Sequence, residues 1–150
     1  MPDDPLRFRL ATATDAEVLG RLNHQLIRDE GHRNPMSVDA LGERMRSWLC
    51  DDGYEALLGF DGDELVAYVL WRDEPDCVYL RQIFVHRDHR RQGTARHLML
   101  SVFERWPDKR LTVDVLAGNA RALAFWRRMG YRDYAVALER LPPGSEPDTQ

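Results

Sequence analysis

The sequence predicts one domain of the α/β class, more closely α+β, with the element order β-α-α-β-β-β-α-β-α-β. Apolar residues recur every three or four positions in four segments, as in amphipathic helices, and short apolar runs between these segments suit strands. Asp61-Gly62 joins two of the runs, and this dipeptide favours a tight hairpin because both residues tolerate positive φ. With 150 residues and 43% hydrophobic content, the chain suits a single globular domain with a core.

The first half of the chain carries two helix-start signals. Thr14 and Glu17 have the spacing of a capping box, in which each side chain binds an N–H group at the helix start. Ser37 is a suitable N-cap for the next apolar stripe, which consists of Val38, Leu41, Met45, Trp48 and Leu49. The elements expected here are a strand at residues 6–11, helices at 15–29 and from 37 onward, and a hairpin formed by 54–60 and 64–71.

The second half alternates strands with helices. The first of its helices has apolar residues on one face and ends at Pro107-Asp108. The second begins after Asn119, a good N-cap, and ends before Gly130, which suits the left-handed position that closes many helices. Strands are expected at residues 77–85, 111–117 and 132–140. Residues 142–150 cannot build a core and are expected to be a disordered tail, so the domain spans residues 1–141.

A basic loop containing glycine connects the strand at 77–85 directly to the next helix. Exposed N–H groups at a helix start carry partial positive charge, and Gly93 lets the main chain approach an anion closely. The loop predicts a site for a phosphorylated ligand. Neither G-x-x-x-x-G-K-[ST] nor G-x-G-x-x-G occurs in it, so it is not a Walker loop or a dinucleotide fingerprint. Its positive side chains are Arg87, Arg90, Arg91 and Arg96.

The loop carries the pattern R-x-x-G-x-A, from Arg90 through Gly93 to Ala95. A second pattern, N-x-x-A-x-x-F-W-x-x-x-G-Y, runs from Asn119 to Tyr131, and a strand-like segment lies between the two. In this order and at this separation, the patterns resemble the two signatures of the GNAT superfamily of N-acyltransferases. The resemblance covers nearly the whole chain up to the tail.

This resemblance implies a mixed, mostly antiparallel central sheet flanked by helices, in which the strands at 77–85 and 111–117 run parallel and splay apart. It also implies acetyl-CoA as co-substrate. Main-chain groups of the first strand would bind the pantetheine amides, and the loop backbone would surround the pyrophosphate. The residues implied to contact acetyl-CoA are Ile83, Phe84, Val85, Arg90, Arg91, Gln92, Gly93, Thr94, Ala95, Arg96, Asn119, Phe125 and Trp126.

The implied reaction is transfer of an acetyl group to a primary amine by direct attack. It needs a base for the amine proton, and Asp114 is a candidate, acting directly or through water. The alternative role for the Asp114 side chain is a salt bridge to an arginine. Many family members have a tyrosine as general acid where this chain has Trp126, whose indole cannot serve. Tyr134 and Tyr79 are the candidate substitutes, unless the thiolate leaves without specific help.

The amine acceptor, a small molecule or a peptide, is expected at the segment 29–36 between the first two helices. Glu30 is a candidate to hold a cationic amine, and Arg33 with Arg81 is a candidate clamp for an acceptor carboxylate. The alternative is a polar loop without ligand contacts. A catalytically silent acetyl-CoA-binding sensor or interaction domain is the alternative function.

Composition argues against several other classes. A net charge of −4 and a pI near 5.7 disfavour nucleic-acid binding, and no apolar run approaches the roughly 20 residues of a membrane span. The first five residues do not resemble a signal peptide, so a cytoplasmic protein is expected. Family members often dimerise, and a homodimer is an expectation from the resemblance alone.

Cysteine and histidine placement indicates neither a disulfide nor a metal site. Cys50 and Cys77 form no C-x-x-C motif, so reduced thiols are expected. His86 and His89 have a spacing that a metal could use, but no third ligand is evident nearby and the pair lies within the phosphate-like loop. No metal is therefore expected.

Overall fold

The computed structural model describes residues 5–145. The chain divides into two units, Met1–Asp114 and Val115–Gln150, and each is described by itself. Most of the tail expected to be disordered, residues 146–150, lies outside the described residues. Residues 142–145 form a turn in which the Ser145 N–H donates to the Pro142 carbonyl at 3.1 Å.

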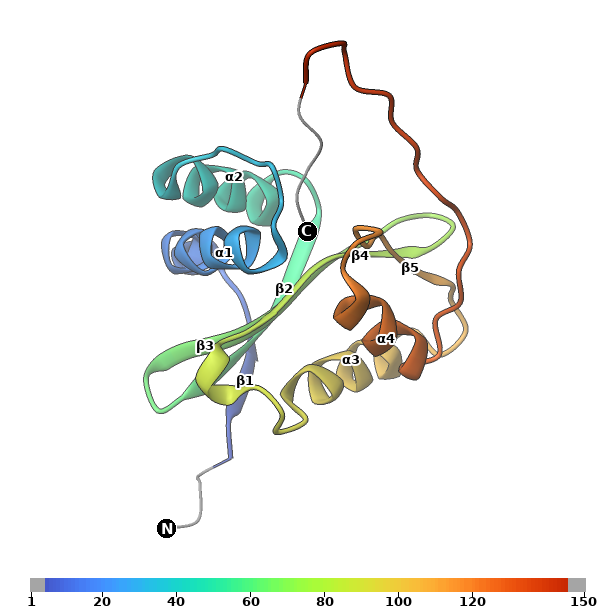
Figure 1. Ribbon diagram of the computed structural model, residues 1–150. Coiled ribbons are helices and arrows are strands. Elements are labelled where there is room, and N and C mark those ends of the chain that lie inside the picture. Colours follow the sequence, from blue (N-terminus) through green and yellow to red (C-terminus); the bar gives the residue numbers. More distant parts are fainter. Residues whose placement is uncertain (1–4, 146–150) are drawn as a thin grey trace. The chain divides into compact units, whose positions relative to one another are not determined.

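The first unit is built on a five-stranded sheet in the order β1-β2-β3-β4-β5 (Figure 1). The pairs β1–β2, β2–β3 and β3–β4 are antiparallel, whereas β4–β5 is parallel. The α/β fold with a mixed, mostly antiparallel sheet is therefore confirmed. The strands are β1 (Arg7–Leu10), β2 (Tyr54–Asp61), β3 (Glu64–Asp73), β4 (Val78–Val85) and β5 (Leu111–Val113).

The hairpin expected at Asp61-Gly62 connects β2 and β3. Asp61 pairs with Glu64, and Gly62 takes the left-handed conformation with φ 60° that this turn requires. The β3–β4 pair contains an irregularity between Leu70 and Trp71, opposite Arg81 in β4. This bulge changes which face of the sheet the β4 side chains occupy on either side of it.

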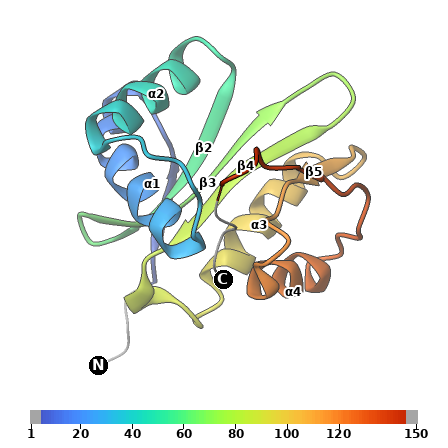
Figure 2. The same cartoon turned by 45° about the horizontal axis from the view of Figure 1, so that its top comes forward.

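Helices cover both faces of the sheet. Helices α1 (Ala16–Glu30) and α2 (Val38–Cys50) lie on one side and α3 (Thr94–Arg105) on the other (Figures 1 and 2). Trp48 of α2 contacts Tyr54 of β2 with ring centroids 5.2 Å apart, and Tyr54 pairs with Arg72 of β3. The preceding residue in β3, Trp71, points to the opposite face and contacts Trp106 after α3.

Helices α1 and α2 approach each other closely at Gly20. A Cβ atom at this position would lie 2.5 Å from the backbone N of Gly42, which no side chain can accommodate without a shift. Both helices pack on the same face of the sheet, through a core that includes Leu19, Leu26 and Met45. This contact holds the two helices together and so fixes both ends of the connecting segment at residues 31–37.

The start of α1 differs from the prediction. Thr14 lies within a short 3-10 turn, η1 (Ala13–Asp15), and the capping box uses Thr12 and Asp15 instead. The Thr12 N–H donates to Asp15 Oδ2 at 2.8 Å. By contrast, the Ser37 cap of α2 is confirmed, since its hydroxyl accepts from the Ala40 N–H at 3.1 Å.

The strands expected late in the chain are shorter or absent. Strand β5 ends at Val113 rather than at residue 117, and no strand follows it within the described residues. The expectation of a strand at 132–140 is therefore wrong. Val136 and Leu138 alternate with small residues as a strand would, but they are 81% and 91% exposed, and residues 115–145 of their own unit contain no strand to pair with. Between Val115 and Ser145, the second unit contains one helix, α4 (Ala120–Arg128).

Candidate functional site

The loop after β4 ends in a helix start without a side-chain cap. Gly93 occupies the N-cap position of α3 with φ 78°, where no side chain closes the helix. The first intrahelical bond runs from the His97 N–H to the Gly93 carbonyl at 2.9 Å. The N–H groups of Thr94, Ala95 and Arg96 therefore have no acceptor within the helix. Such a terminus favours an anion, and no acidic residue occupies the first turn of α3.

The loop backbone is shaped for close approach. Arg91 has φ 65°, which is uncommon for a residue other than glycine, and Gly93 follows two positions later with a similar value. Left-handed residues in a turn direct successive N–H groups to one side, an arrangement that binds anions. Arg87, Arg91 and Arg96 are exposed, and none makes an ion pair within residues 5–145. Their charges are free to add to the potential of the loop.

Arg90 has a different position from the other loop arginines. Its Nε donates to the Val85 carbonyl at 2.8 Å, and its Nη2 donates to Asp29 Oδ2 at 2.7 Å. Burial acts to raise the pKa of Asp29, but hydrogen bonds from Gln25 and Arg90 outweigh it and leave that pKa below its ordinary value. The guanidinium thus links the end of β4, the loop and the end of α1.

Among the described residues, β5 pairs with only the first part of β4. The parallel pairing runs from Val78 to Leu80 only. On the other edge, the His86 N–H donates to the Val66 carbonyl at 2.7 Å, so His86 and Val66 form a hydrogen-bonded pair of the β3–β4 ladder. Because such pairs alternate along antiparallel strands, the main-chain groups of Ile83 and Val85 point away from β3. Those of Phe84 point toward β3, and its ring is buried.

Two of the candidate catalytic residues are brought together. The Tyr79 hydroxyl of β4 donates to Asp114 Oδ2, just after β5, at 3.1 Å. Tyr79 pairs with Thr112, so Asp114, two residues on, lies on the same face of the sheet. Burial, followed by the Asp114 charge and hydrogen bond, raises the pKa of Tyr79, so its phenol stays protonated over a wider pH range than usual.

The sequence comparison identifies the family. The profile of the acetyltransferase (GNAT) family matches residues 22–131, which is most of the chain. The chain belongs to the acetyltransferase (GNAT) family. No curated protein sequence matches it. The loop from Arg90 to Arg96 and the helix after Asn119 both lie within the matched part.

Solved structures with the GNAT fold align over nearly the whole chain. A ribosomal-protein-alanine N-acetyltransferase from Brucella melitensis biovar Abortus 2308 is 18% identical, with a TM-score of 0.73 over 91% of this chain and 99% of that one. The aminoglycoside N-acetyltransferase AAC(6')-Iy, in complex with CoA, is 17% identical, with a TM-score of 0.75 over 95% and 99%. The aminoglycoside acetyltransferase meta-AAC0020 from an uncultured soil metagenomic sample, in complex with sisomicin, is 14% identical, with a TM-score of 0.73 over 95% and 99%. These likenesses show the fold.

The second GNAT signature lies in the second unit. The Asn119 side chain caps α4 by accepting from the Ala122 N–H at 3.1 Å, as expected. Trp126 is 6% exposed and contacts the rings of Phe125 and Tyr131, each at 5.0 Å between centroids. Tyr134 is 84% exposed. The indole thus contacts two aromatic rings of its own unit, and the cofactor and catalytic roles of these residues stay predictions.

The candidate acceptor residues come from the end of α1, the segment after it and β4. Glu30 ends α1, and its Oε1 lies 3.1 Å from His32 Nε2, while burial raises the pKa of the Glu30 carboxyl. Arg33 is exposed in the segment between α1 and α2. Arg81 donates to the Tyr54 hydroxyl at 3.4 Å, and its guanidinium lies 4.6 Å from the centre of the Trp48 ring.

Sequence reasoning missed Arg44 and gave Trp48 only a core role. The Arg44 guanidinium lies 4.3 Å from the centre of the same Trp48 ring that Arg81 contacts. Arg44 precedes Trp48 by four positions, so both lie on one helix face, and this spacing was the available signal. That β4 brings a second arginine to the ring is a tertiary contact with no local signal.

Neither a metal site nor a membrane helix is present in residues 5–145. No three His, Cys, Asp or Glu side chains converge there on a metal position. His89 Nε2 lies 2.9 Å from Asp61 Oδ2, and His86 Nδ1 accepts from the Asp88 N–H, so both side chains order the loop. No helix in this part of the chain has the length and apolarity to cross a membrane. Cys50 and Cys77 are both free thiols.

Proposed function

We propose that this GNAT protein is an acetyl-CoA-dependent N-acetyltransferase that moves an acetyl group to a primary amine by direct attack. The observation that carries the proposal is the position of the Tyr79–Asp114 pair. Tyr79 lies on β4, whose far end leads into the uncapped start of α3, and Asp114 follows β5, the parallel partner of β4. One strand therefore connects a phosphate-type anion site with a carboxylate suited to proton removal.

The loop and β4 would hold acetyl-CoA. The N–H groups of Thr94, Ala95 and Arg96, with the backbone of residues 91–93, fit a pyrophosphate, and the exposed arginines supply positive charge. The Ile83 main chain and the Val85 N–H, which point away from β3, fit the amides of pantetheine. The β3–β4 register favours Ile83 and Val85 over Phe84 for binding pantetheine, because the Phe84 main chain points toward β3. Arg90 would position the loop through Val85 and Asp29.

Asp114 is the proposed base, acting directly or through water. One of its oxygens accepts from Tyr79, and the other makes no hydrogen bond within residues 5–145, so it can accept from an acceptor ammonium group. The amine nitrogen bonds to the thioester carbonyl carbon as the C–S bond breaks, and the amine proton passes to Asp114. A backbone N–H of β4 would stabilise the negative charge that develops on the carbonyl oxygen.

The proton for the departing thiolate has two candidate sources. Tyr79 is engaged with Asp114, and its raised pKa makes it a weaker acid than an ordinary phenol. Tyr134 is an exposed phenol of the second unit. A thiol of pKa about 8.5 is also a fair leaving group, so solvent can supply the proton. Asn119, Phe125 and Trp126 are proposed to contact the cofactor because they match the family signature.

Two measurements test the proposal. Acetyl-CoA should bind and stabilise the protein, whereas ATP and NAD should not. Mass spectrometry of the protein with acetyl-CoA and pooled polyamines, amino acids, aminoglycosides and peptides should then detect an acetylated amine. Binding without any product from this panel would favour the silent acetyl-CoA-binding domain. Stabilisation by ATP alone would overturn the acetyltransferase proposal.

A further inference from the structure

Two guanidinium groups from different elements lie against one indole ring. Arg44 comes from α2 and Arg81 from β4, at 4.3 Å and 4.6 Å from the centre of the Trp48 ring. Trp48 is 8% exposed, so the ring is fixed by its surroundings. Attraction between a cation and an aromatic face stabilises each contact by about 0.5–2 kcal/mol, but it leaves both positive charges uncompensated.

Neither arginine has a carboxylate partner within residues 5–145. Arg44 Nη2 donates to the amide oxygen of the fully buried Asn23 at 3.1 Å, and its Nε is buried without any acceptor. Within the same residues, the one hydrogen bond of the Arg81 side chain goes to the Tyr54 hydroxyl, at a long 3.4 Å. Other arginines of the chain do bind carboxylates at 2.7–2.9 Å, namely Arg9, Arg72, Arg90 and Arg127. The chain has 25 acidic residues, so the missing partner does not reflect a shortage of them.

The two charges destabilise each other. Burial lowers the pKa of Arg44, and the nearby Arg81 charge lowers it further. A bound anion would offset both costs, because its negative charge would pair with each guanidinium. A carboxylate suits this site best, since its two oxygens match the planar donor geometry of guanidinium groups.

The arginine pair lies beside the proposed base. Arg81 and Tyr79 both come from β4 on the face toward α1 and α2, and Tyr79 packs against the cluster that contains Trp48 and Tyr54. The Arg81 charge acts on the Tyr79 phenol, which donates to Asp114. An acceptor that spans these groups would have its anion at the arginines and its amine at Asp114.

We propose that Arg44 and Arg81 bind a carboxylate of the acceptor, so that the substrates are amines that also carry a carboxylate, such as amino acids or ω-amino acids. This inference rests on the proposed acetyltransferase function. It also implies discrimination against polycationic amines, because two guanidinium groups repel a second positive charge. The clamp expected from the sequence was Arg33 with Arg81, and this proposal keeps Arg81 but gives it Arg44 as its partner.

The first test compares acceptors that differ only in the carboxylate. Glycine, β-alanine, 4-aminobutyrate, 5-aminovalerate and alanine are each compared with their carboxamides and with spermidine and kanamycin. At least one carboxylate should be acetylated with a kcat/KM about tenfold or more above that of its amide, since a charge-assisted pair is lost in the amide. Equal rates for each acid and its amide, or preference for the polycations, would overturn the proposal.

The second test detects binding without catalysis. The Nε–H signals of Arg44 and Arg81, assigned by NMR from the Arg44→Gln and Arg81→Gln variants, should shift on titration of the CoA-bound protein with the same carboxylates. The amides should leave these signals in place. Both variants should lose the acid-over-amide preference while they keep their affinity for acetyl-CoA. Arg46→Gln is the matched control, because Arg46 is an exposed arginine of the same helix, and it should retain the preference.

The two proposals fail in different ways. Carboxylate-dependent shifts without acetyl transfer would support the anion site and count against the proposed enzyme. Transfer to amines with no carboxylate preference and no shifts would support the enzyme and overturn the anion site. Shifts and transfer that favour phosphoethanolamine over every carboxylate would also overturn the carboxylate assignment, since the bound anion would then be a phosphate.

Discussion

The Tyr79 hydroxyl donates a hydrogen bond to Asp114 Oδ2 at 3.1 Å, across the end of the only parallel strand pair among the described residues. Tyr79 and Asp114 are 35 positions apart in the sequence. The pairing of β4 with β5 brings them together. If Asp114 is the base, Asp114→Asn should lower kcat about 10²–10⁴-fold, because an amide cannot take the amine proton. The dissociation constant of acetyl-CoA should stay unchanged.

Tyr79→Phe should have a smaller effect, about tenfold in kcat, if the phenol only orients Asp114. Because the Asp114 charge contributes to the raised Tyr79 pKa, Asp114→Asn should also move the phenol titration, followed by ultraviolet absorbance, to lower pH. Tyr134→Phe removes the other candidate general acid, so its kcat is compared with that of Tyr79→Phe. Full turnover of both Phe variants at all pH values would exclude a phenol as the general acid.

Gly93→Glu should abolish measurable acetyl-CoA binding. The new carboxylate would occupy the N-terminus of α3, where the orphan N–H groups are proposed to hold the pyrophosphate. Gly62→Glu is the matched control, because both glycines have positive φ and open space at the Cβ position, and the backbone strain of about 1–2 kcal/mol is shared. Calorimetric titration with acetyl-CoA checks the result. Equal affinity of the two variants would show that this loop is not the phosphate site.

The effect of Asp29→Asn on acetyl-CoA affinity should show what Arg90 does, because Asp29 binds the Arg90 guanidinium. If Arg90 positions the loop, Asp29→Asn should weaken acetyl-CoA binding about two- to tenfold, since it removes a charge-assisted bond that holds the guanidinium. If Arg90 instead binds phosphate directly, loss of the competing carboxylate should strengthen binding. Arg28→Gln, an exposed neighbour on α1, is the control and should leave the affinity unchanged. A fluorescence titration distinguishes the two signs.

The features that the sequence predicted well depend on contacts within a few residues. The Ser37 and Asn119 caps and the Asp61-Gly62 hairpin are of this kind, because the donor and acceptor are close along the chain. The phosphate-type loop also follows from local order, a strand end joined to a helix start by glycine. A family signature then added the sheet topology, which local patterns alone do not determine.

The features that were missed depend on packing. The strand expected at 132–140 has the alternation of a strand, but a strand forms only where a neighbour supplies hydrogen bonds. The pairing of Arg44 with Arg81 needs α2 and β4 to meet at Trp48, which no local spacing encodes. At the start of α1, two overlapping segments fit the capping pattern, Thr12 with Asp15 and Thr14 with Glu17. A contact from β1 decides between them.

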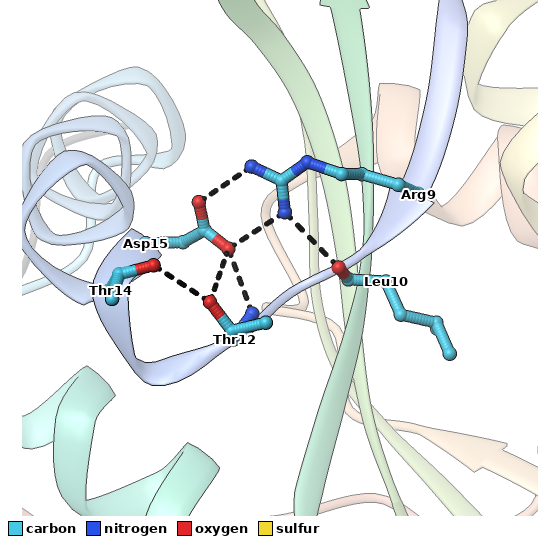
Figure 3. Close-up of polar contacts among 5 residues, drawn as sticks. All are labelled: Arg9, Leu10, Thr12, Thr14 and Asp15. Carbon is cyan, nitrogen blue, oxygen red and sulfur yellow. Dashed lines mark hydrogen bonds and ion pairs between the residues drawn. The ribbon is translucent and has the colours of Figure 1, made fainter.

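That contact is the bidentate pair between Arg9 and Asp15 (Figure 3). Arg9 Nη1 donates to Asp15 Oδ2 at 2.9 Å and Nη2 donates to Oδ1 at 2.8 Å, while the Thr12 N–H also donates to Oδ2. The carboxylate therefore joins β1 to the start of α1. Hydrogen bonds from Arg9 are the main reason that the pKa of Asp15 lies below its ordinary value, and burial acts in the opposite direction.

The pair predicts how stability changes with pH. Because the Asp15 pKa is lower in the folded state than in the unfolded chain, its contribution is complete above the unfolded value of about 3.9 and is lost as pH falls through the folded value. Asp15→Asn should therefore cost about 1 kcal/mol of unfolding free energy at pH 7 and progressively less below pH about 4. Urea denaturation at both pH values measures this difference. The control is Glu17→Gln, which alters an 82% exposed side chain that lies 3.6 Å from Arg21; it should change the unfolding free energy little at either pH. If Asp15→Asn still lowered the unfolding free energy by the same amount at acid pH, the carboxylate charge would not be what stabilises this junction.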